Sequence, residues 1–177
     1  GKGGVMTING ATFTDNEAGN NGGAIYNTGT LVINGGLFEE NEAEQWAGAI
    51  YNTGRTDNKD LKMATTKERE TAGDLTVKNA QFLNNHAVYG GALVAGLTAK
   101  NTYVENTLFK GNTASELGAV ALFSSATLNN VQFIDNKATG ESYSDGGLIN
   151  NYYSNLNTIN VCYSIFVNNT MAYNSII

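Results

Sequence analysis

The sequence predicts an all-β protein wound as a solenoid, and three observations lead to that prediction. Glycine and asparagine contribute 21 and 26 of the 177 residues, and because these types tolerate left-handed backbone best, the chain is rich in turns. Two short motifs alternate along the chain in a unit of about 25 residues. The segments between them are short and rich in β-branched residues, which is typical of strands.

The first motif is Phe-x-x-Asn, which occurs six times with an aliphatic residue five positions before each phenylalanine. In a solenoid each residue lies over its counterpart in the next coil, so we expect the phenylalanines to stack inside and the asparagines to form an amide ladder at a left-handed turn. The phenylalanines are Phe13, Phe38, Phe82, Phe109, Phe133 and Phe166. The asparagines are Asn16, Asn41, Asn85, Asn112, Asn136 and Asn169.

The second motif is Gly-Gly-Ala followed by an aliphatic residue. It occurs, with two degraded copies last, at residues 22–25, 47–50, 90–93, 117–120 and 146–149. The segment AIYNTG is identical at residues 24–29 and 49–54. We expect the aliphatic residue of this motif to form a second internal column, since an apolar column is what stacked repeats bury.

Each unit contains three short stretches with strand character, at residues 23–27, 30–34 and 36–40 of one copy. Such a unit cannot bury its own apolar face, whereas stacked units bury a continuous core. The sequence therefore predicts about six coils of roughly 25 residues, forming a single domain over residues 1–177. We expect this domain to be a segment of a longer solenoid, because its ends would leave strand edges uncapped.

One insertion, residues 55–73, interrupts the repeat and carries 9 of the 26 charged residues. A loop that leaves a rigid scaffold often carries recognition, and a loop of mixed charge can clamp an acidic partner or a receptor. A loop without function is the other interpretation, and the sequence favours neither. The basic side chains are Arg55, Lys59, Lys62, Lys67 and Arg69.

Four aromatic residues flank the second motif and are candidate binding residues. Trp46 and Tyr89 directly precede it, and Tyr26 and Tyr51 directly follow its aliphatic residue. Because the aliphatic residue points inward, strand alternation predicts that both tyrosines point outward, one strand spacing apart. An exposed aromatic column can hold a sugar ring or a partner side chain. The alternative is a cross-strand contact that only stabilises the sheet.

Composition excludes several classes of protein. The net charge of −6 opposes the phosphate neutralisation that nucleic-acid binding requires. With one cysteine, Cys162, and one histidine, His86, the chain has neither a Cys/His zinc cluster nor an intrachain disulfide, and we expect no metal or cofactor. No apolar run is long enough for insertion of this segment into a membrane.

Together, the two motifs resemble the repeats of the polymorphic membrane proteins of chlamydiae and of related surface adhesins. The resemblance covers nearly the whole chain apart from the insertion. It implies a right-handed parallel β-helix, secreted or displayed at the cell surface as in autotransporter passengers, and used in attachment. The implied partner is a glycan or protein on a host or neighbouring cell, or further copies of the same solenoid.

Three functions remain open at this stage. The leading one is a noncatalytic extracellular β-helix that presents an adhesive surface, and the second is a filament subunit that stacks end to end. The third is a polysaccharide lyase or hydrolase, because such enzymes share the pectin-lyase-like architecture. Its best acidic cluster is Asp15 and Glu40 with Glu39, and solvated turn acids explain that cluster better. We therefore expect no enzyme.

Overall fold

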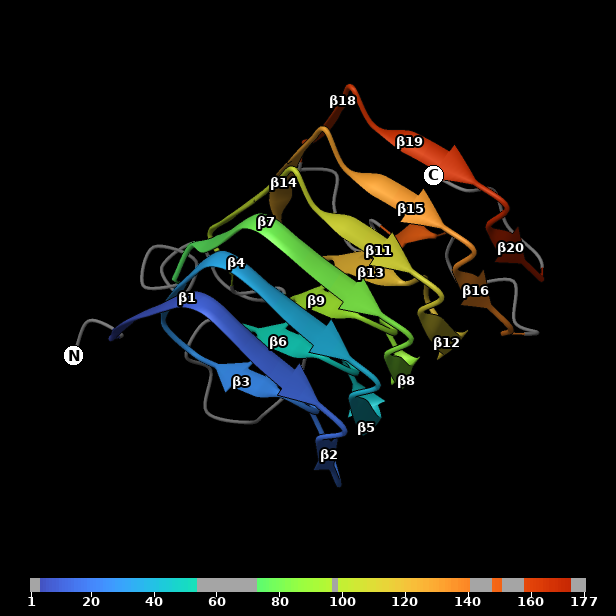
Figure 1. The fold of residues 1–177 in the computed structure, drawn as a ribbon, viewed down its shortest axis with the longest axis horizontal. Coiled ribbons are helices and arrows are strands. Elements are labelled where there is room, and N and C mark those ends of the chain that lie inside the picture. The colour runs from blue at the N-terminus through green and yellow to red at the C-terminus, as the bar shows by residue number, and fades with distance from the viewer. Residues whose placement is uncertain (1–3, 54–72, 97–98, 141–147, 151–157, 173–177) are drawn as a thin grey trace.

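The computed structural model describes residues 4–53, 73–96, 99–140, 148–150 and 158–172, and in these ranges the chain forms strands and no helix (Figure 1). The strands belong to three parallel sheets, named A, B and C here. The chain passes from A to B to C and then returns to A one strand further along (Figure 1). The all-β, parallel character that the repeat predicts is therefore confirmed.

Sheet A contains the longest strands and is the broadest of the three. Its strands are β1 (Val5–Thr14), β4 (Thr30–Glu39), β7 (Leu75–Leu83), β10 (Asn101–Glu105), β11 (Leu108–Lys110), β14 (Ser125–Asn129), β15 (Gln132–Ile134), β18 (Ile159–Cys162) and β19 (Ile165–Val167). Sheet B consists of β2 (Glu17–Ala18), β5 (Glu42–Trp46), β8 (His86–Tyr89), β12 (Thr113–Glu116), β16 (Lys137–Ala138) and β20 (Thr170–Met171). Sheet C consists of β3 (Ile25–Asn27), β6 (Ile50–Asn52), β9 (Leu93–Ala95), β13 (Val120–Leu122) and β17 (Ile149–Asn150).

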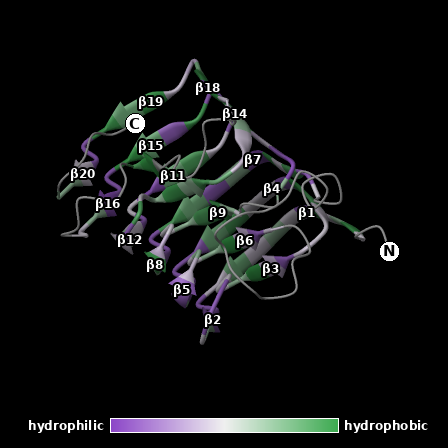
Figure 2. Cartoon of the chain, turned by 180° about the vertical axis from the view of Figure 1, so that it is seen from behind, coloured by the Kyte–Doolittle hydropathy of each residue, from purple (hydrophilic) through white to green (hydrophobic). Residues whose placement is uncertain are grey.

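The strand register places like residues over one another across the whole stack. Phe38 of β4 pairs with Phe82 of β7, although 44 residues separate them in the sequence. The charged insertion, which lies outside the described residues except for Gly73, therefore leaves the repeat in phase on both sides. Hydrophilic residues recur at one edge of the coils, beside β2 and β5 (Figure 2).

The interior is filled by columns of apolar side chains, among them the phenylalanine column and aliphatic columns from sheets A and C. The phenylalanine rings of successive coils stack almost parallel, with centroids 4.8 to 5.1 Å apart and interplanar angles of 5 to 13°. On the opposite side, sheet C contributes an aliphatic column, in which Ile50 pairs with Ile25 and with Leu93. Because these columns occupy the interior, the outer faces and the turns of the described coils are what a partner at the side of the solenoid can reach.

In the described residues, three corner columns with positive φ bend the coils. The first corner lies three residues before each phenylalanine and contains Gly10, Gly35, Asn79, Asn106, Asn130 and Tyr163. The second corner lies two residues after it and contains Asp15, Glu40, Asn84, Gly111, Asp135 and Asn168. The third corner begins the glycine motif and contains Gly22, Ala47, Gly90 and Leu117.

The sequence suggested that the ladder asparagines themselves adopt left-handed backbone, and this expectation is wrong. That conformation belongs to the preceding residue, for example Asn84 at φ 54° before Asn85. The ladder residue instead turns its amide into the bend. Asn112 Oδ1 accepts from the backbone N–H of Asn85 at 3.0 Å and from its Nδ2 at 2.8 Å. Asn112 Nδ2 donates to Asn136 Oδ1 at 3.0 Å and to the carbonyl of Phe82 at 2.9 Å. The inner ladder side chains are fully buried and use their full hydrogen-bonding capacity.

The second glycine of the glycine motif is required by the distance between coils. A Cβ at Gly91 would lie 3.0 Å or less from backbone atoms of Thr113. The alanine that follows it, Ala92, is fully buried next to the core residue Leu93. In this motif the second glycine therefore allows neighbouring backbones to approach closely, the alanine occupies a small buried space, and the aliphatic residue packs in the core.

Candidate functional site: an aromatic cluster at the glycine turns

The four aromatic residues singled out in the sequence lie together near the third corner. Trp46 ends β5 and Tyr89 ends β8, and the two are partners in the register of sheet B. Their rings stack with centroids 4.4 Å apart at an angle of 24°. Both side chains are half-buried. The pair thus forms a rigid, partly accessible aromatic surface.

The two tyrosines lie side by side on sheet C but differ in exposure. Tyr26 and Tyr51 are register partners with ring centroids 5.5 Å apart. Tyr26 is 54 % exposed, as alternation predicts, whereas Tyr51 is only 6 % exposed. The expectation that both rings face solvent is wrong for Tyr51, because its outward-pointing ring is covered.

The burial of Tyr51 has an identifiable cause in a second apolar cluster outside the coil interior. Its ring packs against Trp46 at a centroid distance of 6.3 Å and lies in a cluster with Val94 and Ala121, which are both fully buried. Phe123, directly after β13, adds a ring edge-on to Trp46 at 5.7 Å. Sequence reasoning missed Phe123, since the equivalent residues after β6 and β9 are Thr53 and Gly96 and no repeated pattern marks it.

Burial also determines the electrostatics of the cluster. Removal of the Tyr51 hydroxyl from water raises its pKa above the ordinary value of 10.0, and the neighbouring Tyr26 raises it further, against a hydrogen bond from Thr53 that lowers it. Tyr51 therefore stays neutral at physiological pH. The cluster can offer aromatic faces and hydroxyl groups to a partner, and Tyr26 is its most exposed tyrosine.

The other candidate residues from the sequence, the basic residues of the insertion and the acidic cluster, are not part of the aromatic cluster. The basic residues of the insertion, Arg55, Lys59, Lys62, Lys67 and Arg69, lie outside the described residues. The acids Asp15 and Glu40 occupy the second corner at φ 55° and 54°, where they are exposed, and Glu39 is half-buried beside them. The structure thus gives these acids a position in a turn.

No group of three or more His, Cys, Asp or Glu side chains in the described ranges is arranged to hold a metal ion. Nor does any helix there have the length and apolar character needed to cross a membrane.

The stacked parallel coils and the outward-facing cluster define a β-solenoid repeat protein that presents its side chains on its outer surface. Residues 10–28 match the Chlamydia polymorphic membrane protein (Chlamydia_PMP) repeat. The matched stretch contains the first Phe-x-x-Asn and the first glycine motif. The resemblance seen in the motifs is therefore confirmed for this repeat, which points to a surface, adhesin-type family. Comparison with curated proteins gave no match. Comparison with solved structures likewise gave none.

Proposed function

We propose that this chain is a noncatalytic, right-handed parallel β-helix of pectin-lyase-like architecture that presents an adhesive surface outside the cell or at its surface. The observation that supports this proposal is the match of residues 10–28 to the polymorphic membrane protein repeat. The same two motifs continue in register through the following coils. The partner we propose is a glycan or protein on a host or neighbouring cell.

A rigid solenoid suits attachment for a physical reason. Its surface side chains are held by packed columns, so a partner that binds them loses its own freedom but orders little of the scaffold. Tyr26 is the most favourable contact in the aromatic cluster, because its ring is exposed while Tyr51 fixes it from behind at 5.5 Å. A partner side chain or sugar ring that covers Tyr26 gains apolar burial and a hydroxyl group for hydrogen bonding.

Bead attachment tests this proposal directly. Beads coated with the purified chain are expected to bind cultured epithelial cells in larger numbers than beads coated with albumin. Tyr26→Ala is expected to reduce attachment several-fold. Thr28→Ala, an exposed position in the same coil, serves as the matched control and should leave attachment unchanged.

The urea midpoint of Thr28→Ala should equal that of the wild type, since this side chain is exposed. Tyr26→Ala should lower the midpoint only slightly, since its half-exposed ring loses its contact with Tyr51. Attachment no greater than that of albumin-coated beads would refute the adhesive function. Unchanged attachment by Tyr26→Ala would remove the aromatic cluster from it. A variant in which the five basic residues of 55–73 are changed to serine tests in the same attachment assay whether the insertion contributes to adhesion.

A further inference from the structure

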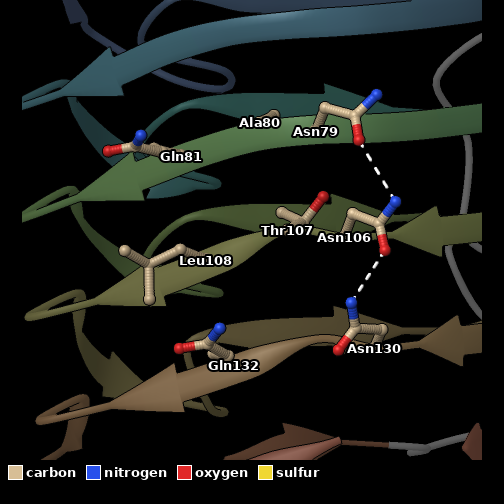
Figure 3. Close-up of a pocket in the computed structure, with 8 residues that line it drawn as sticks. All are labelled: Asn79, Ala80, Gln81, Asn106, Thr107, Leu108, Asn130 and Gln132. Atoms are coloured by element: carbon tan, nitrogen blue, oxygen red, sulfur yellow. Dashed lines mark hydrogen bonds between the residues drawn. The ribbon is translucent and has the colours of Figure 1, made fainter. Parts of the chain in front are cut away.

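A groove on the outer face of sheet A is separate from the aromatic cluster and has its own chemistry. It has a volume of about 280 Å³. One wall is the column Asn79, Asn106 and Asn130, and the other is the column Gln81, Leu108 and Gln132 (Figure 3). Ala80 and Thr107 lie between the walls (Figure 3). The groove therefore crosses three coils and runs along the solenoid axis.

The asparagine wall is a second amide ladder, exposed where the inner ladder is buried. Asn106 Nδ2 donates to Asn79 Oδ1 at 3.2 Å, and Asn130 Nδ2 donates to Asn106 Oδ1 at 2.8 Å. Each bond uses one of the two N–H groups of an amide, so a second donor and a second lone pair stay available. The ladder holds these groups in a fixed row, one per coil spacing of about 4.8 Å.

Such a row matches hydroxyl groups better than charges. An amide both donates and accepts, and a hydroxyl does the same, so a row of amides complements a row of hydroxyls. All residues that line the groove are uncharged. The nearby Lys78 and Glu105 form an ion pair at 3.0 Å, so that their charges offset each other. These features favour a neutral, polyhydroxylated ligand.

A peptide that adds a strand does not suit this groove. Strand addition requires an unpaired sheet edge. The groove instead lies across the face of β7, β11 and β15, whose backbones already pair with one another. Recognition here must come from side chains that project from the face.

Tyr163 extends the amide column with an aromatic ring. It occupies the first corner in the coil after Asn130, whose backbone N–H donates to the carbonyl of Cys162 at 3.0 Å. At this corner the other coils have glycine or asparagine, whereas Tyr163 holds φ 51° with 87 % of its surface exposed. A bulky side chain is disfavoured at such φ, and an exposed ring adds little to folding.

This corner is exposed in other coils as well. Asn79 and Asn106 are also exposed, although coils pair on both sides of them. A ring at this corner continues the column of amides with an aromatic group. That combination fits a pyranose, which has a face of C–H groups and a rim of hydroxyls.

We propose that this groove binds an extended oligosaccharide of neutral pyranoses along the solenoid axis, with Tyr163 stacking on one ring and Asn106 and Asn130 bonding to hydroxyls. The repeat of an extended sugar chain is comparable to the coil spacing, so successive rings meet successive amides. This inference rests on the proposed adhesive function and names a ligand class for it.

Isothermal titration with cellohexaose, xylohexaose and chitohexaose tests the inference, with hexagalacturonate as the acidic comparison. We expect at least one neutral probe to bind and hexagalacturonate to bind at least about tenfold more weakly. Tyr163→Asn and Asn130→Gly are expected to weaken binding about tenfold each. Each variant introduces a residue already present at this corner in another coil, so urea midpoints should be unchanged or higher.

Thr28→Ala, at an exposed position that does not line the groove, is the control and should bind the neutral probe as the wild type does. The inference is overturned if no neutral probe binds, if hexagalacturonate binds best, or if Tyr163→Asn and Asn130→Gly both bind normally. Cell attachment that persists without oligosaccharide binding refutes the groove but leaves the adhesive function in place. Oligosaccharide binding without cell attachment would support the groove and refute the adhesive function.

Discussion

The buried asparagine ladder makes the most quantitative prediction, and Asn112 is the position at which to test it. In Asn112→Ala, the backbone N–H of Asn85, one N–H of its side chain and the carbonyl of Phe82 each lose a hydrogen bond. Asn136 Oδ1 keeps its bond from the backbone N–H of residue 112. Asn85 and Phe82 are fully buried.

Each buried polar group left without its partner costs about 1 to 3 kcal/mol. The three groups together give about 3 to 9 kcal/mol. Because water can enter the space that the side chain leaves, we expect Asn112→Ala to lower the free energy of unfolding by about 3 to 6 kcal/mol. Backbone strain does not contribute, because residue 112 does not have positive φ.

Asn16→Ala is the matched control within the same ladder. Asn16 is half-buried and donates to Asn41 Oδ1 at 2.7 Å and to the exposed carbonyl of Thr14 at 3.2 Å. After its removal, Asn41 Oδ1 still accepts from the backbone N–H of residue 16 at 3.2 Å. We expect a loss below about 1 kcal/mol.

Urea unfolding followed by circular dichroism measures both variants against the wild type. A lower midpoint at unchanged slope reports a change in stability alone. If Asn112→Ala shifted the midpoint no more than Asn16→Ala, the ladder would not be a major source of stability, and the reasoning from buried hydrogen bonds would fail.

Two further predictions concern the aromatic cluster and the glycine motif. Burial raises the pKa of Tyr51 in the folded protein, so the stability that the neutral hydroxyl contributes is complete below the unfolded pKa of about 10 and is lost as pH rises through the folded pKa. Above about pH 10, Tyr51→Phe should therefore lose less thermal stability than the wild type does. Parallel pH profiles for the two proteins would contradict this. Gly91→Ala places a Cβ against the backbone of Thr113 and should lower the free energy of unfolding by about 3 kcal/mol or more. Gly19→Ala, with open space around its Cβ, should change little, and equal urea midpoints for the two glycine variants would refute the close-approach argument.

The internal columns could be predicted because their residues stand at constant offsets from one another. In every copy of the first motif the asparagine follows the phenylalanine by three residues, as Asn112 follows Phe109. Stacking of the coils turns this constant offset into two columns. The first corner follows the same rule, three residues before each phenylalanine. Asn79, Asn106 and Asn130 were therefore predictable from the sequence, because they too stand at a constant offset from a phenylalanine.

The exposure of outward-pointing residues could not be predicted in the same way. Alternation along a strand determines whether Tyr51 points into the coil or out of it. It does not determine what lies on the outside, where Trp46 and Phe123, from different coils, pack in the same apolar cluster. Tyr26, one coil away at the same motif position, stays exposed.

The sequence by itself determined the parallel coil, its core columns and its amide ladder, because a repeat is a one-dimensional pattern and stacking adds only a translation along the axis. The tertiary structure decided which outward side chains a partner can reach. It exposed Tyr26 and Tyr163, buried Tyr51, and formed a groove between two polar columns. Accessibility depends on neighbours from other coils that no offset within one repeat specifies.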